Sequence, residues 1–414
     1  MQRILLVCLT LFALYASAAA QSLAQPDDTP ARTPIQTGPA PANAGEAKAA
    51  APVAKAATPH IALLLPTKSE TFGAPANAVQ QGFMAAVLES KTLPIRLYSD
   101  FDEDKSVTTA YMQAIANGAV AVVGPLTRNG VIALTTHNEI PVPTLALNIK
   151  DDPLTQNLYF FGLGIELEAR QVARLARENG VKQAIVITSR APLSKRLQAA
   201  FESEWSHTGG EVLREIEYND DPAIFSDLAD TPDTAIFLAT DADKARLIRP
   251  YLIVRHTLPE PAVAPTPSDN PPVSTPPPAS TKLPIYATSR VFVGNDNTLA
   301  NFDLSDIRFV DMPWLLQMDH PAVMTYPRAN PPLSVENERL YGLGIDAFRL
   351  IQLLLAGNVV DALPMDGVTG QIQLSNHLFQ RVATPAVFAQ GRAQPNDAPI
   401  IRNADFPYAP VNTP

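Results

Sequence analysis

The chain has 414 residues, a hydrophobic fraction of 46% and a formal net charge of -10. This length exceeds what one hydrophobic core usually serves, so we expect two domains or lobes. The acidic balance, and the lack of a basic stripe with interleaved aromatic residues, exclude the usual signature of nucleic-acid binding.

The first twenty residues have the pattern of a secretory signal peptide. Arg3 supplies the positive charge, residues 4–15 form an apolar run, and the small residues at 16–18 or 18–20 suit signal cleavage. The apolar run is too short to span a bilayer comfortably. We therefore predict a signal peptide at residues 1–20 and a periplasmic location for the mature protein.

The one cysteine of the sequence, Cys8, lies inside this segment. Bacterial lipidation normally requires a small residue just before the cysteine, whereas Leu5-Leu6-Val7 precede it after only a short apolar run. We therefore expect no outer-membrane lipid anchor at Cys8. We also expect no disulfide or thiol chemistry in the mature protein.

Residues 21–59 are rich in Ala and Pro without a hydrophobic period, which predicts a disordered linker. The globular part then begins at His60. Its first predicted elements are strand 61–65, helix 77–90, strand 95–98, helix 106–117, strand 119–123, helix 131–138 and strand 144–147. Short apolar strands that alternate with helices are typical of a parallel sheet.

A second series of the same kind begins after strand 158–161. Its predicted elements are helix 166–179, strand 184–187, helix 191–206, strands 211–218 and 235–238, helix 242–255 and strands 284–288 and 307–310. A proline-rich stretch at 258–283 predicts a disordered surface insert, with a ligand for proline-recognition domains as the alternative. A long helix follows at 334–356, then an antiparallel pair at 367–374 and 384–390, and a tail at 393–414. Two α/β series in a secreted chain suggest two lobes that close by a hinge.

The ordered motifs of the chain resemble the type I periplasmic binding fold, and more closely the C-terminal module of the penicillin-binding-protein activators of the LpoA type. The motifs are HIALLLPTKSETFGAPANAVQQGFMAA from His60, VVGPLTRNGV from Val122, PTLALN from Pro143, YFFGLGIELEARQVA from Tyr159, LPIYATSRVFVGN from Leu283, RLYGLGIDAFRL from Arg339 and MDGVTGQIQLS from Met365. Together they cover residues 60–392. Their joint order carries the resemblance, because single motifs such as VGPL are only moderately specific.

The resemblance implies an α/β fold of two Rossmann-like lobes with parallel sheets and three crossings, near Phe161, Phe309 and Met365. Lobe 1 would comprise residues 60–160 and 310–365, and lobe 2 residues 161–309 and 366–392. The implied function is a non-catalytic regulator that binds and activates a class A penicillin-binding protein, a bifunctional peptidoglycan synthase. The activators usually carry a lipidated cysteine and a helical repeat domain before this module. Too few residues precede His60 here for that domain, which puts outer-membrane anchorage in question.

Candidate site residues follow from the rule that ligands of open parallel sheets lie beyond the carboxyl ends of the strands. They are Thr67, Ser69, Glu70, Thr127, Arg128, Asn129, Asn148 and Lys150. Thr127 could donate to an anion at a helix N-terminus and Arg128 could pair with it. The alternative is that Thr127 or Asn129 only caps the helix while Arg128 is solvated, and that the other candidates are turn or cap residues.

An amino-acid receptor for a transporter is the second hypothesis, with a possible small ligand in the cleft. Leu126 weakens it, because receptors of this fold favour a small polar residue there. We expect Tyr159 and Phe161 to be core residues beside the hinge. We expect Asp346 to be a solvated helix residue or a local hydrogen-bond partner.

Signals for catalysis or metal binding are poor. The six His residues are isolated, and no nucleophile or phosphate-loop motif is present, so we expect no enzyme activity, metal or cofactor, with a hydrolase as a distant third hypothesis. Gly342 and Gly344 mimic part of a dinucleotide fingerprint, but they lie inside a predicted helix and indicate helix packing. The acidic loop at 100–104 lacks the Gly and terminal Glu of a calcium loop, so a solvated turn is expected.

Overall fold

The computed structural model describes residues 57–99, 106–137, 139–150, 155–229, 231–254 and 283–396. The predicted signal peptide at 1–20 with Cys8, nearly all of the predicted linker at 21–59, and the acidic loop at 100–104 lie outside the described residues. So do residues 258–282 of the proline-rich insert and residues 397–414 of the tail.

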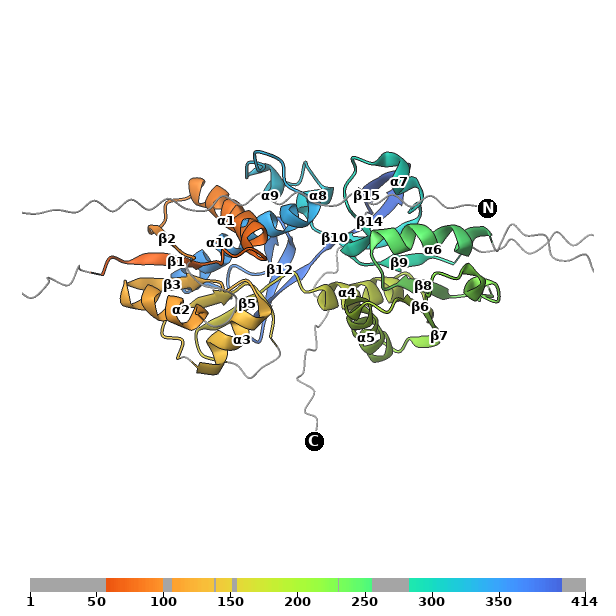
Figure 1. Ribbon diagram of the computed structural model, residues 1–414, viewed down its shortest axis with the longest axis horizontal. Coiled ribbons are helices and arrows are strands. Elements are labelled where there is room, and N and C mark those ends of the chain that lie inside the picture. Colours follow the sequence, from red (N-terminus) through yellow and green to blue (C-terminus); the bar gives the residue numbers. More distant parts are fainter. Residues whose placement is uncertain are drawn as a thin grey trace, which may run out of the picture. The chain divides into compact units, whose positions relative to one another are not determined.

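The first sheet has eight strands in the order β11-β12-β13-β5-β4-β3-β1-β2 (Figure 1). Its strands are β1 (His60–Leu64), β2 (Ile95–Tyr98), β3 (Ala119–Val123), β4 (Thr144–Ala146), β5 (Leu158–Phe161), β11 (Met365–Gly367), β12 (Gly370–Ser375) and β13 (Leu378–Val382). Every neighbouring pair from β2 to β13 is parallel, whereas β12 is antiparallel to both β13 and β11.

The second sheet has seven strands in the order β15-β14-β10-β9-β8-β6-β7. Its strands are β6 (Gln183–Thr188), β7 (Glu211–Glu217), β8 (Thr234–Leu238), β9 (Ile285–Ala287), β10 (Ile307–Asp311), β14 (Thr384–Ala389) and β15 (Arg392–Pro395). The strands from β7 to β10 are parallel, and β14 and β15 complete the sheet in antiparallel pairing. The α/β fold with two parallel-dominated sheets is therefore as predicted.

Helices cover both faces of each sheet, and the strand sequences show why. In β1, Ile61 and Leu63 enter one apolar cluster while Ala62 and Leu64 enter another, because successive side chains of a strand point to opposite faces. The first cluster includes α1 (Gly73–Leu88) and α10 (Val335–Ala356), and the second includes α2 (Val107–Ala116) and α3 (Arg128–His137). Unbroken apolar runs such as residues 61–65 are thus strands buried on both faces.

The second sheet is covered in the same way. In β6, Ala184 and Val186 pack with α4 (Ile165–Glu178) and α5 (Pro192–His207), and its alternate residues pack with α6 (Ala242–Val254). The shorter helices are η1 (Pro222–Phe225), η2 (Ser289–Val291), α7 (Thr298–Phe302), α8 (Pro313–Leu316) and α9 (Pro321–Met324).

Two glycines allow α1 and α10 to pack closely. A Cβ on Gly82 would lie 1.9 Å from the carbonyl oxygen of Tyr341, and one on Gly344 would lie 2.1 Å from the carbonyl oxygen of Val79. The fingerprint-like sequence around Gly344 is therefore a helix-packing motif, as predicted.

The chain enters the second sheet after β5, returns after β10, and enters it again at Ala383, between β13 and β14. The prediction of a third crossing near Met365 is wrong, because β11, β12 and β13 all belong to the first sheet. Residues 366–382 therefore do not lie in the predicted lobe 2. The predicted tail also begins too early, since residues 393–395 lie in β15.

The same error affects the predicted antiparallel pair. Residues 367–374 do not pair with residues 384–390: β12 pairs with β13, and β14 pairs with β10 and β15. Asn376 and His377 form the turn between β12 and β13, with φ angles of 48° and 62°. The hairpin is not apparent from the sequence because such turns usually contain Gly.

Candidate functional site

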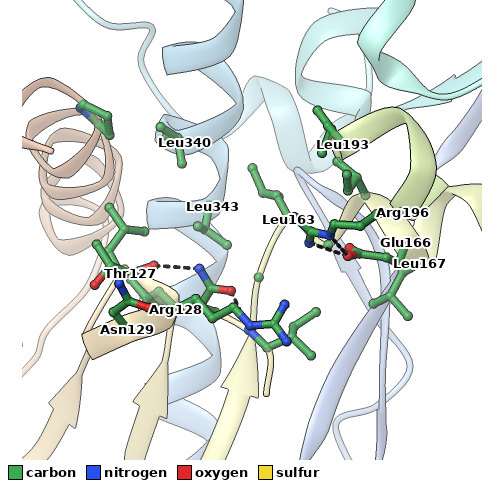
Figure 2. Close-up of a pocket in the computed structure, with 18 of the residues that line it drawn as sticks. Thr127, Arg128, Asn129, Leu163, Glu166, Leu167, Leu193, Arg196, Leu340 and Leu343 are labelled. Carbon is green, nitrogen blue, oxygen red and sulfur yellow. Dashed lines mark hydrogen bonds and ion pairs between the residues drawn. The ribbon is translucent and has the colours of Figure 1, made fainter. Parts of the chain in front are cut away.

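A cleft of about 930 Å³ lies beyond the carboxyl ends of β3, β4 and β5 (Figure 2). Its walls include the loops that follow these three strands, the N-terminal turns of α1, α4 and α5, the α10 helix and the start of β13. Two of these helices, α4 and α5, pack on the second sheet, so residues from both sheet systems form the cleft. Its place at the strand ends follows the general rule for parallel sheets.

Aliphatic side chains are the largest group among the residues that line the cleft. Its aliphatic side chains are Leu126, Leu147, Ile149, Leu163, Ile165, Leu167, Leu193, Leu340, Leu343 and Leu378. Figure 2 shows Leu163, Leu340 and Leu343 around the same space. A wall of this composition suits a ligand with an apolar body.

The end of the loop after β3 and the start of α3 place the three candidates Thr127, Arg128 and Asn129 on the cleft wall. The amide of Gly130 donates to Thr127 Oγ1 at 3.1 Å, so Thr127 caps α3. This is the capping alternative stated above, and it starts the helix at Arg128, one turn earlier than residue 131.

Asn148 also lines the cleft, and its side-chain amide holds the two neighbouring loops together. Its Nδ2 donates to the carbonyl oxygen of Leu126 at 2.9 Å, and its Oδ1 accepts from the amide of Ile149 at 2.9 Å. Both ends of the amide are therefore occupied by the backbone, and Asn148 shapes the wall between the β3 and β4 loops.

The other four candidates are not among the residues that line the cleft. Ser69 accepts from the amide of Phe72 at 3.2 Å, just before α1, and Thr67 accepts through its carbonyl from Asn77 at 3.4 Å. Glu70 is exposed. Lys150 donates to Thr135 Oγ1 at 2.9 Å, so it ties its loop to α3.

Three charged residues that were not among the candidates also line the cleft. Arg170, Glu166 and Arg196 line the wall formed by α4 and α5. Glu166 Oε1 accepts from Arg196 Nε at 2.7 Å, and this ion pair is drawn in Figure 2. Behind the wall, Glu168 pairs with Arg381 in the protein interior. The sequence signal that could have pointed to Glu166 is Gly164, which comes directly before an amphipathic helix.

A second buried ion pair joins Arg339 and Asp311. Arg339 of α10 donates to both carboxylate oxygens of Asp311, which ends β10, at 2.7 to 3.3 Å. Arg339 also donates to the carbonyl oxygens of Ser289 and Phe292 at 3.1 and 2.9 Å. These bonds connect α10 with the second sheet system.

Asp346 is fully buried, so the solvated alternative is wrong, whereas the alternative of a local hydrogen-bond partner is confirmed by the bond from Arg349 Nη1 at 3.1 Å. It accepts from the amides of Val368 and Thr369 at 3.2 and 2.8 Å and from the Thr369 hydroxyl at 2.7 Å. Burial raises the pKa of the Asp346 carboxyl. Phe161 is fully buried and is a core residue as predicted, whereas Tyr159 is half-buried, packs against the core and stacks on His377 with ring centroids 4.7 Å apart.

Within the described residues, no group of three His, Cys, Asp or Glu side chains is placed to hold a metal ion. No helix in the same part of the chain is long and apolar enough to cross a membrane.

A comparison with known protein families shows to which family the chain belongs. The family model described as "LppC putative lipoprotein" matches residues 51–390. The chain belongs to the LppC family. The predicted resemblance to activators of the LpoA type is confirmed by relatives of this LppC chain. One is the penicillin-binding protein activator LpoA of Photobacterium profundum, 27% identical over 372 residues, which cover 81% of this chain and 57% of that protein. The chain thus spans about half the length of the curated relatives it matches.

Solved structures support the fold of the LppC chain. The C-domain of LpoA from Haemophilus influenzae, a regulator of PBP1A, is 22% identical with a TM-score of 0.63, and the match covers 81% of this chain and 99% of that chain. A putative branched-chain amino acid ABC transporter from Chromobacterium violaceum is 32% identical with a TM-score of 0.63, covering 79% and 99%. These similarities confirm the predicted fold of the periplasmic-binding-protein type.

Proposed function

We propose that this protein is a periplasmic regulator that binds a class A penicillin-binding protein and activates peptidoglycan synthesis, without catalysis of its own. The observation that carries the proposal is membership of the LppC family together with the match to the LpoA activators over 81% of the chain. The part of those relatives that this chain shares includes the region that corresponds to the C-domain of the Haemophilus influenzae regulator.

The proposed location rests on the N-terminal sequence. Residues 1–20 have the order of charge, apolar run and small residues expected of a signal peptide. Fractionation of cells that express the full chain, with N-terminal sequencing of the product, tests this. Recovery of an uncleaved chain from the cytosol would contradict the proposal.

The activator proposal is tested with purified full-length mature protein. Each class A synthase of the same organism is tested for binding by pull-down, and for glycan polymerisation and crosslinking with and without the protein. We expect binding to one synthase and a higher rate of at least one of its two reactions. Absence of both would contradict the proposal, and an unrelated periplasmic protein of similar charge serves as the control.

A solute-binding protein for an ABC transporter is the second candidate. It is favoured by the 32% identity to the Chromobacterium violaceum protein, which this chain matches over 99% of that protein's length. A ligand that binds only the folded state raises its stability by RT ln(1 + [L]/Kd), so a thermal-shift screen detects it. A ligand that is bound tightly and taken up by cells only when this protein is present would favour this candidate.

A further inference from the structure

We propose that a network of buried charges holds the two sheet systems in one relative orientation, so that the protein does not open and close about a hinge. This property goes beyond the proposed activation of a synthase and does not depend on it. The network, called the junction network below, consists of two ion pairs joined through one serine: Glu168, Arg381, Ser289, Arg339 and Asp311.

The junction network is continuous from one ion pair to the other. One carboxylate oxygen of Glu168 binds Arg381, and the other accepts from the amide and hydroxyl of Ser289 at 3.1 and 2.6 Å. The carbonyl oxygen of Ser289 accepts from Arg339 at 3.1 Å, and Arg339 donates to both carboxylate oxygens of Asp311. The two arginines belong to the first sheet system, in β13 and α10, and the other three residues belong to the second. Each ion pair therefore joins one residue of each system.

The junction network also reaches all three segments in which the chain passes between the sheets. The first, residues 162–164, leads directly into α4, which carries Glu168 and Gln171. The second begins after Asp311, at the end of β10. The third passes through Ala383, whose amide donates to Gln171 Oε1 at 3.0 Å and whose carbonyl oxygen accepts from Gln171 Nε2 at 2.7 Å. A hinge motion changes the backbone torsion angles of such connecting residues, so it would separate these bonded groups.

The junction network lies in the protein interior. The exposed fractions of the four charged side chains are 4% for Arg381, 5% for Glu168, 11% for Arg339 and 1% for Asp311. A motion that separates an enclosed pair leaves both charges uncompensated, which lowers the population of the separated arrangement by a factor of roughly 100 or more. An exposed ion pair has no comparable effect, because water solvates its charges when they part.

Side chains at the end of α8 act in the same direction. Leu315 packs against the core clusters of both sheets. Gln317, directly after this helix, accepts from the hydroxyl of Thr384 at 3.1 Å, next to the third crossing. Because protein interiors are closely packed, a side chain shared by two cores opposes rotation of one sheet against the other.

The consequence is a fixed surface. Two lobes that close around a ligand need connecting segments that are free to bend, and the sequence alone suggested such a hinge. The bonded crossings favour a rigid body in which both sheet systems keep their places. A partner that contacts both systems then meets a surface that is already arranged, so binding loses no affinity to a minor population of competent protein.

The first test measures a distance across the cleft in the full mature protein. Ala74 and Ala199 are exposed residues of α1 and α5, two helices of different sheet systems whose N-terminal turns line the cleft. The one cysteine of the sequence, Cys8, lies in the predicted signal peptide, so Ala74→Cys and Ala199→Cys supply the two sites for spin labels. Double electron–electron resonance should give one narrow distance distribution. Two distances in this protein would overturn the proposal.

The second test compares this distribution with that of a variant without the junction charges. The variant Glu168→Gln/Asp311→Asn/Arg339→Met/Arg381→Met removes both ion pairs together and leaves no charge unpaired. We expect it to show a broader distribution or a second distance. The matched control Lys182→Gln/Asp233→Asn removes an exposed ion pair and should keep the original distribution. An unchanged distribution in the folded variant, verified by circular dichroism, would overturn the proposal.

Hydrogen exchange of the unaltered protein keeps the proposal testable if the variant does not fold. The amides of Ser289 and Ala383 donate to side chains of α4, so they exchange only when the junction opens. They should exchange as slowly as the amides of the central strands β1 and β3. Exchange more than about tenfold faster than in those strands would contradict a fixed junction. Neither measurement involves a synthase, so its result is separate from the test of activation.

Discussion

Glu168 in α4 and Arg381 in β13 form a buried ion pair although they lie 213 positions apart in the chain. Glu168 belongs to a helix that packs on the second sheet, and Arg381 belongs to the first sheet. The other carboxylate oxygen of Glu168 accepts from the amide and hydroxyl of Ser289 at 3.1 and 2.6 Å. Arg381 also donates to the carbonyl oxygen of Thr369 at 3.3 Å. The pair therefore connects the two sheet systems, and each partner has further hydrogen bonds.

Replacement of Arg381 by Met should destabilise the protein strongly. The variant leaves the Glu168 carboxylate buried without its counterion, and the loss of one partner of a buried pair typically costs about 3–5 kcal/mol. Denaturant unfolding measures the change in the free energy of unfolding.

The double variant Glu168→Leu/Arg381→Met should lose less than the sum of the single variants, because no charge stays unpaired. Arg190→Gln is the control at an exposed ion pair with Glu217 and should cost less than about 1 kcal/mol. Equal effects of Arg381→Met and Arg190→Gln would contradict the role of the buried pair.

Replacement of Gly82 by Ala should disrupt the contact between α1 and α10. The added methyl would lie 1.9 Å from the carbonyl oxygen of Tyr341, which belongs to helix backbone and can move only with its helix. We expect a loss of about 1–3 kcal/mol or more from overpacking, measured as a lower thermal midpoint. Gln81→Ala, at the exposed neighbouring position of α1, should be close to neutral; a similar loss there would point to a general effect on the helix.

Replacement of Thr127 by Ala should remove the cap of α3. Loss of a capping hydroxyl costs about 0.5–2 kcal/mol, and Thr127→Ser should restore most of it because serine is an equally good cap. Chemical denaturation compares the three proteins. If Thr127→Ser were as unstable as Thr127→Ala, the methyl group rather than the hydroxyl would be responsible.

Glu202 should make stability fall as the pH rises from acid toward neutral. Gln198 Nε2 donates to both Glu202 and Glu215 at 2.8 Å, which brings the two carboxylates near one amide. Burial, with a further contribution from the charge of Glu215, raises the pKa of Glu202 above its ordinary value of 4.5. Between that value and the raised pKa the folded state binds more protons than the unfolded state, so the contribution of Glu202 to stability decreases with pH.

Thermal unfolding across this pH range, compared with that of Glu202→Gln, measures the effect. The variant should show a smaller decrease in stability with rising pH. Glu217 is a control of opposite sign, because hydrogen bonds from Lys195 and Arg190 lower its pKa, so its contribution is lost as the pH falls. An unchanged pH profile in Glu202→Gln would refute the assignment.

The strands could be predicted because they depend on local sequence. The run from Ile61 to Leu65 is apolar at every position, and its residues alternate between two clusters, as a strand covered on both faces requires. Thr127 could be predicted as a cap because its partner, Gly130, is three residues away. The position of the cleft could be predicted from the rule that ligand sites lie beyond the carboxyl ends of parallel strands. The cleft wall includes Thr127, Arg128, Asn129 and Asn148.

The buried charges could not be predicted because most of their partners are distant in sequence, although Arg349 lies only three residues from Asp346. Asp346 is an acidic residue in an apolar helix, and only the fold reveals that Val368 and Thr369 donate to it. The position of β13 depends on the turn at Asn376 and His377, whose positive φ angles the residue types do not signal. Arg170 and Glu166 were missed because they look like the polar face of an amphipathic helix.

The place of β13 in the first sheet has a consequence for the newly made chain. His377 Nδ1 contacts the carbonyl oxygen of Leu158, 219 positions earlier, and β14 pairs with β10 in the second sheet. In each sheet one inner strand, β5 or β10, therefore lacks a neighbour until residues 378–389 have been synthesised. Contacts this far apart in sequence form slowly, and an unpaired edge strand can associate with other chains. A polypeptide that stops before Leu378 would thus leave β5 and β10 each unpaired on one side and able to associate with other chains.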